Sequence, residues 1–401
     1  MKPPRSLPVR ALQAAPDQRP GPSPGTNSPL DCSCPGKAPR GGSRSGPAEP
    51  DPRTPLGWVV LRGALSVLAA GLVGASAAAA APAALTEPAL VTPKALGAAM
   101  LAVTRAGERL VAVGERGTVL WSDDGGARWQ QAKVPVQAAL TAVRFADARA
   151  GWAVGHLGVI LKTEDGGRSW ARQLDGVQAA AALQAAAGAD ERAQRQAQRM
   201  VEEGPDKPFF DLEVIDARHA VAVGAYGLAF ATSDGGAHWA PLPTASANPK
   251  SLHLYGVRVQ GERWFMAGEQ GLLLHSTDGG ASFAPLASPY KGSFFGLLAA
   301  RTGTLIAYGL RGSAWRSADA GASWDKLELG SSVTLQAGIE RAPGQLVLLG
   351  QTGEIFASQD DGRSFTSLNT PAGPLPAAGL ASAPDGAWVI ASLRGIRRAA
   401  P

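Results

Sequence analysis

Six aspartates are the most conspicuous candidates for chemistry, because they recur in one short pattern, Ser/Thr-x-Asp-x-Gly-x-x-Trp/Phe. They are Asp124, Asp165, Asp234, Asp278, Asp319 and Asp360. A reaction needs a catalytic carboxylate once, whereas a turn residue is needed in every repeat. A short carboxylate can accept hydrogen bonds from the backbone N–H groups of its own turn, and the glycine supplies a conformation that other residues resist. We therefore predict a structural role for all six motifs, here called Asp boxes.

Metal, thiol and cofactor chemistry have little support in the sequence. No two of the five histidines have the spacing of metal ligands. The two cysteines, Cys32 and Cys34, both lie within the first 81 residues. The Gly-x-x-Gly segments lack the strand-loop-helix context of a phosphate-binding loop. We predict no metal and no small-molecule cofactor.

The spacing of the Asp boxes predicts the architecture. Successive aspartates are 41, 69, 44, 41 and 41 residues apart, and a four-stranded propeller blade needs about 40 to 45 residues. Before the second box, residues 151–155 and 158–162 alternate as two strands joined by a hairpin, and residues 140–145 precede them as an inner strand. Each box therefore falls between the third and fourth strands of a blade.

The boxes account for six blades, and the C-terminal part of the chain supplies a seventh. Residues 379–381, 387–391 and 395–398 repeat the first three strands of a blade without a box. We expect residues 85–92 to provide its fourth strand and to close the ring, which leaves no long free sheet edge. The sequence thus predicts an all-β fold, a seven-bladed β-propeller over residues 82–401.

One long step between boxes indicates an insertion at residues 175–203. This segment is rich in Ala, Gln, Arg and Glu, with a break near residues 188–190, and it predicts a helical hairpin. It lies between blades two and three, so it should rise from the face that carries the hairpins between second and third strands. We call this the tip face, and the opposite one the Asp-box face. A partner-binding cap and a tolerated surface excursion both fit the insertion.

The first 81 residues differ in composition from the rest. Residues 1–57 are rich in Pro, Arg, Gly and Ser and should be disordered. Residues 58–81 combine a basic flank, a short apolar stretch and an alanine-rich end, which predicts a signal peptide or an uncleaved N-terminal anchor. We expect a periplasmic or secreted protein, or a membrane-associated one if the anchor is retained.

The net charge of +5 does not predict nucleic-acid binding. Nine of the 38 Lys and Arg residues and four of the 33 Asp and Glu residues lie in the first 81 positions. The remainder therefore carries equal numbers of positive and negative side chains. A nucleic-acid partner would need a basic surface that this balance does not provide.

Partner contacts are expected on the tip face, because loops there can vary without disturbing the blades. The predicted contact residues at hairpin tips are Arg116, His156, Tyr226, Arg311 and Arg394. Those at the entries between blades are Lys207, Phe209, His253, Tyr255, Lys291 and Phe294. Arginine and aromatic side chains are favoured anchors in protein interfaces. The alternative is that these are ordinary solvated tips.

Asp boxes also occur in sialidases, so a carbohydrate-active propeller is the alternative function. A sialidase needs three arginines for the substrate carboxylate, a tyrosine nucleophile with a carboxylate partner, and an aspartate acid/base. The Arg-Ile-Pro signature expected before the first blade is absent, and the chain has only four tyrosines. Two glycosidase carboxylates about 5 to 10 Å apart could still lie in the loops between blades. We favour a binding protein over an enzyme.

The Asp boxes, the blade count and the Val-Gly-x-x-Gly hairpins at Val113, Val154 and Val223 resemble the photosystem II stability/assembly factor family. The resemblance covers residues 85–398, and residues 204–210 are similar to its bacterial, non-photosynthetic members. It implies a non-enzymatic, chaperone-like factor that binds a membrane protein during assembly, in photosynthetic members through an arginine-rich surface. Residues 331–336 contain no arginine at the matching place, which favours another envelope complex as the client.

Overall fold

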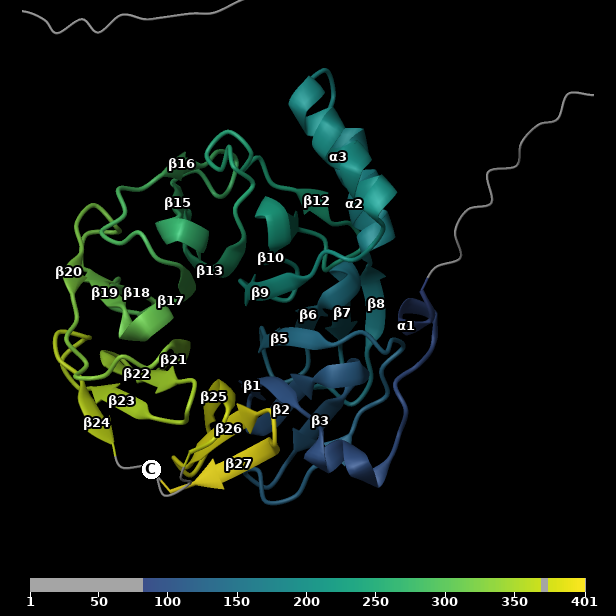
Figure 1. Ribbon diagram of the computed structural model, residues 1–401. Helices are drawn as coiled ribbons and strands as arrows, with labels where there is room; N and C mark the ends of the chain where they lie inside the picture. The colour runs from purple at the N-terminus through teal and green to yellow at the C-terminus, as the bar shows by residue number, and fades with distance from the viewer. Residues whose placement is uncertain (1–81, 369–373, 401) are drawn as a thin grey trace, which may run out of the picture. The chain divides into compact units, whose positions relative to one another are not determined.

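The computed structural model describes residues 82–368 and 374–400, whose strands form seven antiparallel sheets. The sheets are arranged as blades around a central axis (Figure 1). The chain is therefore a seven-bladed β-propeller, as predicted from the six boxes and the C-terminal strands that follow them. The predicted disordered leader and the predicted signal peptide or anchor, residues 1–57 and 58–81, lie outside the described residues. No helix in the described part of the chain is long and apolar enough to cross a membrane.

Each blade takes consecutive strands, and its first strand is the innermost (Figure 1). Blade 1 contains β1 (Met100–Ala106), β2 (Arg109–Gly114), β3 (Val119–Ser122) and β4 (Gln130–Gln131). Blade 2 contains β5 (Leu140–Phe145), β6 (Gly151–Gly155), β7 (Ile160–Thr163) and β8 (Ala171–Leu174). Blade 3 contains β9 (Phe209–Val214), β10 (Ala220–Gly224), β11 (Ala229–Thr232) and β12 (Ala240–Pro241).

The remaining blades continue in the same order. Blade 4 contains β13 (Leu254–Gln260), β14 (Arg263–Gly268), β15 (Leu273–Ser276) and β16 (Ala284–Pro285). Blade 5 contains β17 (Phe294–Ala299), β18 (Leu305–Gly309), β19 (Ala314–Ser317) and β20 (Asp325–Lys326). Blade 6 contains β21 (Leu335–Ala342), β22 (Gln345–Gly350), β23 (Ile355–Ser358) and β24 (Thr366–Leu368). Blade 7 contains β25 (Ala377–Ser382), β26 (Trp388–Ser392) and β27 (Gly395–Ala399).

The Asp boxes close the turn between the third and fourth strands by hydrogen bonds within the motif. In blade 2 the Asp165 carboxylate accepts hydrogen bonds from the backbone N–H groups of Arg168 at 2.9 Å and Ser169 at 3.0 Å. The Thr163 hydroxyl donates to Asp165 at 2.8 Å and accepts from the Gly167 N–H at 2.9 Å. The other five boxes repeat the bonds of the hydroxyl and at least one backbone bond to the carboxylate. The polar side chains of the boxes are thus engaged in hydrogen bonds within their own turns.

The same bonds lower the pKa of the box aspartates. The hydroxyl and backbone N–H of Ser323 and the hydroxyl of Ser317 hold the pKa of Asp319 at about 2. Equivalent serine contacts hold the pKa of Asp278 and Asp360 at about 2. These carboxylates are therefore fixed as anions in the turns, which suits a structural acceptor and does not suit a proton donor near neutral pH.

The tips between second and third strands have the same backbone conformation in blades 1 to 5, a three-residue 3-10 turn. These turns are η2 (Glu115–Gly117), η3 (His156–Gly158), η4 (Ala225–Gly227), η5 (Glu269–Gly271) and η6 (Leu310–Gly312). In blade 2 a Cβ atom on Gly155 would lie 2.1 Å from the carbonyl oxygen of Ala139, so only glycine fits there. That oxygen accepts a hydrogen bond from the His156 N–H at 2.8 Å. The following residue, Leu157, has a φ of 58°. The equivalent left-handed positions hold Arg116, Tyr226, Gln270 and Arg311.

The core is divided among the junctions between blades. Each of the seven junctions contains its own cluster of buried apolar side chains in the described residues. The aromatic residue of each box joins one of these clusters. Trp170, for example, lies between blades 1 and 2, and Trp239 between blades 2 and 3. Burial of these faces is the main favourable term in holding neighbouring blades together.

The prediction that residues 85–92 form the fourth strand of blade 7 is wrong. The described part of that sheet has three strands, and residues 85–92 form no strand in it. Instead Leu85, in the short helix α1 (Ala83–Thr86), is buried between blades 1 and 2, and its carbonyl accepts a hydrogen bond from Arg172 at 2.6 Å. The Ala89 N–H donates to the Val134 carbonyl at 2.9 Å. Burial of Leu85 therefore draws this segment along blade 1, and only the turn η1 (Pro93–Gly97) comes near β27.

The insertion forms the predicted helical hairpin, α2 (Gly176–Ala186) and α3 (Glu191–Glu203). Asp175 and Gln178 form a capping box at the start of α2, and Asp190 caps α3. The hairpin leaves from the tip face and projects outward beyond the ring beside blade 3 (Figure 1). It does not stand over the central axis, because Ala179, Ala180 and Met200 pack against blades 2 and 3.

Candidate functional site: the mouth of the central channel

A β-bulge occurs at the same place in the first strand of every blade. In blade 3, Phe209 pairs with Gly224 and Asp211 pairs with Val223, so Phe210 between them is left out of register. The same shift occurs in the other six blades. Bulges are known to re-aim side chains. The second residue of each inner strand is thereby placed out of the regular alternation at the tip-face end.

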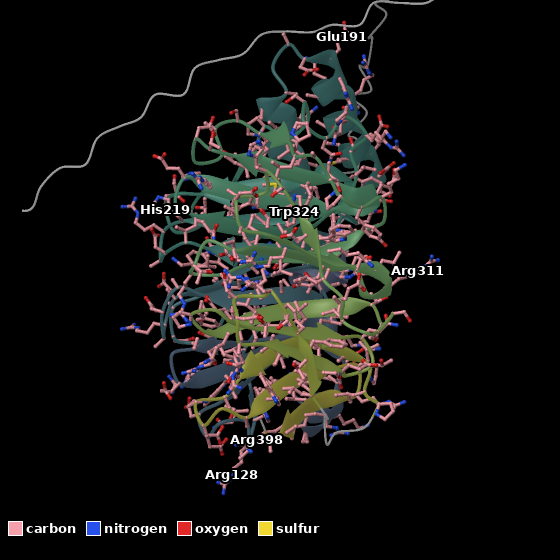
Figure 2. All side chains as sticks on the ribbon, turned by 90° about the vertical axis from the view of Figure 1, so that its left-hand side faces the viewer. Arg128, Glu191, His219, Arg311, Trp324 and Arg398 are labelled. Atoms are coloured by element: carbon pink, nitrogen blue, oxygen red, sulfur yellow. The ribbon has the colours of Figure 1, made fainter. Side chains whose placement is uncertain are left out.

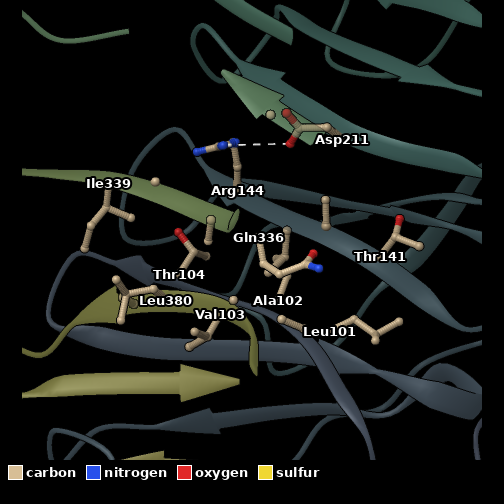
Figure 3. A pocket seen from close by; sticks show the side chains of 18 of the residues that line it. Leu101, Ala102, Val103, Thr104, Thr141, Arg144, Asp211, Gln336, Ile339 and Leu380 are labelled. Carbon is tan, nitrogen blue, oxygen red and sulfur yellow. Dashed lines mark ion pairs between the residues drawn. The ribbon is translucent and has the colours of Figure 1, made fainter. Parts of the chain in front are cut away.

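The bulged residues surround the central channel. They are Leu101, Thr141, Phe210, Tyr255, Phe295, Gln336 and Ala378, and all seven line a cavity of about 360 Å³. Figure 3 shows Leu101, Thr141 and Gln336 around this cavity. None of the seven carries a charge, and the three aromatic residues come from the consecutive blades 3, 4 and 5. The mouth of the channel is therefore aromatic on one side, and on the other it combines apolar Leu101 and Ala378 with polar, uncharged Thr141 and Gln336.

The aromatic side extends from the channel to the nearest hairpin tip. The ring centroids of Phe210 and Tyr255 are 5.1 Å apart, and those of Tyr255 and Phe295 are 5.5 Å apart. His253 lies 5.9 Å from Tyr255 and 4.8 Å from Tyr226. These five residues, here called the aromatic arc, have the edge-to-face and tilted arrangements that favour ring packing. The arc is held in place by the His253 Nδ1, which accepts a hydrogen bond from the Tyr226 N–H at 2.8 Å.

Charged residues line the channel beyond the arc. Arg258 donates to the Asp211 carboxylate at 2.6 Å, and this oxygen also accepts from the Val257 N–H at 3.2 Å. The neighbouring Arg144 lies 3.8 Å from Asp211, an ion pair drawn in Figure 3. Arg144 uses its Nε to donate to the Leu212 carbonyl at 2.7 Å, and 35% of its side chain is exposed. Blades 2, 3 and 4 are thus joined by charges at the level where the other blades carry small or apolar residues.

Burial controls the ionisation of this group. Loss of water works against the charge of Arg258, but Asp211 and Glu213 more than offset it and raise the pKa of Arg258. Burial raises the pKa of Glu213 against the attraction of Arg144 and Arg258. Burial also raises the pKa of the Tyr308 hydroxyl, which lines the same channel. Arg258 therefore stays cationic near neutral pH.

The structure places the five predicted tip residues on the tip face. Arg116, Tyr226, Arg311 and Arg394 are exposed, and so is His156. Figure 2 shows Arg311 projecting from one side of the molecule and His219, in the turn between β9 and β10, from the other. No ion pair of Arg116, Arg311 or Arg394 is found among residues 82–368 and 374–400. Their contact with a partner stays a prediction.

The entry residues are divided by the bulge, and two of the predicted contacts are corrected. Phe209 and Phe294 are fully buried in the junctions, so neither side chain is available to a partner. The prediction took both residues from the entries between blades and did not include the bulge, which places Phe210 and Phe295 in the channel instead. Tyr255 does line the channel, and Lys291 is exposed. One sequence feature could have indicated the bulge in blades 3 and 5. The inner strand there begins with two consecutive aromatic residues, followed by Asp211 or Gly296.

Lys207 and His253 have local partners. The Lys207 ammonium pairs with Glu203 at 2.8 Å and with Asp206, and it lies 5.5 Å from the centre of the Tyr226 ring. Only 8% of its side chain is exposed. His253 is half-buried within the aromatic arc. Both residues therefore position the arc, and Lys207 offers little surface to a partner.

Seven blades, the repeated Asp boxes and an open central channel define a β-propeller of the Asp-box type. A family model described as photosynthesis system II assembly factor YCF48 matches residues 104–177 and 190–365. The chain belongs to this family. Among curated proteins no match was found.

Solved structures agree with this fold. The structure titled "YCF48 bound to D1 peptide" has a TM-score of 0.58 and 18% identity, covering 79% of this chain and 99% of that one. YCF48 from Cyanidioschyzon merolae has a TM-score of 0.56 and 14% identity, covering 77% and 96%. A GH74 xyloglucanase from Xanthomonas campestris has a TM-score of 0.54 and 18% identity, covering 75% and 52%. At these identities the similarities establish the propeller fold.

Proposed function

We propose that this chain is an exported, non-enzymatic binding factor that assists the assembly of a membrane protein complex through its tip face. The observation that carries the proposal is the tip face itself. Arg116, Arg311 and Arg394 extend from equivalent tips of three blades, exposed and without an ion pair in the described residues. No blade packing depends on them. Exposed arginines on a rigid scaffold are suited to protein recognition.

Membership of the assembly-factor family supports this role. One relative of similar fold is titled as bound to a D1 peptide. That title describes the relative, and we extend only the general activity, binding of a polypeptide client, to this chain. A client other than photosystem II stays part of the proposal, because residues 331–336 contain no arginine.

The chemistry of the channel supports binding over glycoside hydrolysis. The two carboxylates that line it are both ion-paired: Asp211 with Arg258 at 2.6 Å, and Glu340 with Arg301 at 3.1 Å. A glycosidase needs one carboxylic acid whose proton is available and a second carboxylate facing it across the substrate. Each of these two carboxylates is instead engaged by an arginine.

The proposed role is tested by purification from membranes. Tagged protein, with its native leader, is isolated from detergent-solubilised membranes and the co-eluting proteins are identified by mass spectrometry. We expect a membrane protein or its assembly intermediate to be enriched over a tag-only control. Recovery of soluble proteins alone would contradict the assignment.

Export is tested on the same material. We expect the mature N-terminus to lie close to Ala81, since residues 58–81 have the pattern of a signal peptide. Intact-mass measurement of the protein from the periplasmic fraction checks this. A full-length chain in the membrane fraction would mean that residues 58–81 are an uncleaved anchor. A full-length chain in the cytoplasm would contradict export.

A further inference from the structure

The bulged residues form a binding slot rather than a structural plug. A side chain that only filled the channel would be buried, but Phe210, Tyr255 and Phe295 are each partly exposed. They face a cavity of about 360 Å³ whose opposite wall includes Leu101 and Ala378. Ligand pockets in proteins range from about 300 to 1,000 Å³. The slot therefore has room for one or two side chains of a ligand.

The charges of the wall decide which ligand fits. Aromatic boxes can bind cations through the faces of their rings. Here the lining contains four arginines, Arg105, Arg144, Arg258 and Arg341, and two carboxylates, Asp211 and Glu340. Both carboxylates already have arginine partners. Arg105 pairs with Glu108 outside the lining, and the wall keeps a net positive charge. This charge repels a cationic ligand and attracts an anionic one.

Arg144 supplies the donor for such an anion. Its Nε donates to the Leu212 carbonyl and lies 3.5 Å from Glu213, whereas its Nη groups make no hydrogen bond in the described residues and have only the 3.8 Å ion pair with Asp211. The side chain is 35% exposed and points into the channel near Asp211 (Figure 3). Arginine with free N–H groups is a favoured partner of carboxylates. The slot thus combines aromatic surface with an available guanidinium.

We propose that the tip-face mouth of the channel binds an extended segment of the client in which an aromatic side chain is next to an acidic one. The aromatic side chain packs between Phe210, Tyr255 and Phe295, and the acidic side chain reaches Arg144. This inference rests on the proposed function, because it names the part of the client that is recognised. It is distinct from the arginines at the tips, which would contact the surrounding surface of the client.

The test uses short peptides whose ends are capped, so that the glutamate carries their one carboxylate. The probe is Ac-Gly-Ser-Phe-Glu-Gly-NH2, and the matched controls replace Phe by Ala, Glu by Gln or Glu by Lys. Affinities are measured by saturation-transfer NMR and titration. We expect the probe to bind about tenfold more tightly than the Ala peptide, with the Gln peptide weaker and the Lys peptide weakest.

Protein variants locate the binding. Tyr255→Ala and Phe210→Ala should each weaken the probe about fivefold, whereas Tyr255→Phe should retain it, because the ring and not the hydroxyl makes the contact. Arg144→Gln should remove the preference for Glu over Gln and leave the preference for Phe over Ala. Circular dichroism and thermal melts confirm that each variant is folded. The triple variant of Arg128, Arg218 and Arg263 to Ala, which are exposed on the Asp-box face, should bind the probe as the natural chain does.

Several results would overturn the inference. These are equal affinities for the Phe and Ala peptides, tighter binding of the Lys peptide, unchanged binding by a folded Tyr255→Ala variant, or no binding of any probe at millimolar concentration. Any of them together with capture of a membrane client would remove the slot and leave the proposed function. Probe binding without capture of a membrane client would leave the binding slot and contradict the proposed function.

Discussion

The two faces of the propeller use repetition differently. On the Asp-box face the Asp and the Gly of the motif are the same in six blades. The carboxylate and the preceding Ser or Thr hydroxyl form hydrogen bonds within their own turns. On the tip face the backbone repeats but the side chains vary: the left-handed position holds arginine, leucine, tyrosine, glutamine and arginine in blades 1 to 5. Identical residues at equivalent places indicate stability, and different residues at equivalent places indicate recognition.

The same distinction applies within one strand. Positions one and two of each inner strand differ by a single step, yet the first is buried between blades and the second faces the channel. The bulge is thus the device that lets a repeated scaffold offer a varied ring of side chains. Changes at the first position should alter folding, and changes at the second should alter binding.

The largest expected effect separates the neighbours Phe209 and Phe210. Phe209 is fully buried, so Phe209→Ala should lower the free energy of unfolding by about 3–5 kcal/mol. Phe210→Ala should cost under about 1 kcal/mol, because its ring is partly exposed in the channel. Denaturant unfolding of both variants measures the difference. Equal losses for the two substitutions would mean that the bulge does not separate core from channel.

The next effect concerns an Asp box. Asp165→Ala should lower stability by about 1–3 kcal/mol, because the N–H groups of Arg168 and Ser169 lose their acceptor. Thermal melts measure the loss, and client capture by the remaining folded protein should be unchanged. The comparison on the same face is Asp147→Ala, at an exposed turn aspartate outside the boxes that also accepts a backbone hydrogen bond. An unchanged melting temperature with lost capture would assign the box to function.

Acid should weaken the Asp-box face in a defined pH window. The pKa of Asp278, Asp319 and Asp360 in the folded chain is about 2, below that of an aspartate in the unfolded chain. Their contribution to stability is therefore complete above about pH 4 and is lost as the pH falls through about 2. Melts of the natural chain and of Asp319→Asn from pH 5 to pH 2 test this. The variant should lose less stability across the window, and parallel curves would contradict the prediction.

Much of the architecture follows from residues that recur. The box spacing predicts six blades, the C-terminal strands predict the seventh, and the helix formers of residues 175–203 predict α2 and α3, because all three depend on local pattern. The place of residues 85–92 is not local: it depends on whether Leu85 finds its best burial at blade 1 or at blade 7. The bulge is also invisible in the alternation of one strand, so Phe209 and Phe294 were assigned to the surface in place of Phe210 and Phe295.

The smallest expected effect on stability belongs to the tip arginines. Arg116, Arg311 and Arg394 are exposed and unpaired in the described residues, so each change to Ala should move stability by less than about 0.5 kcal/mol. Their loss should still weaken binding, because truncated interface arginines often cost more than about 1 kcal/mol. The two faces therefore make opposite predictions for the same kind of substitution.

The most direct test compares two triple arginine variants in one pull-down from solubilised membranes. One carries Arg116→Ala, Arg311→Ala and Arg394→Ala on the tip face. The other carries Arg128→Ala, Arg218→Ala and Arg263→Ala, which are exposed arginines of the Asp-box face. With matched circular dichroism spectra and melting temperatures, we predict that the tip-face variant recovers several-fold less client than the natural chain while the Asp-box-face variant recovers as much. Equal recovery by the two variants, or a greater loss in the Asp-box-face variant, would contradict the division of roles between the faces.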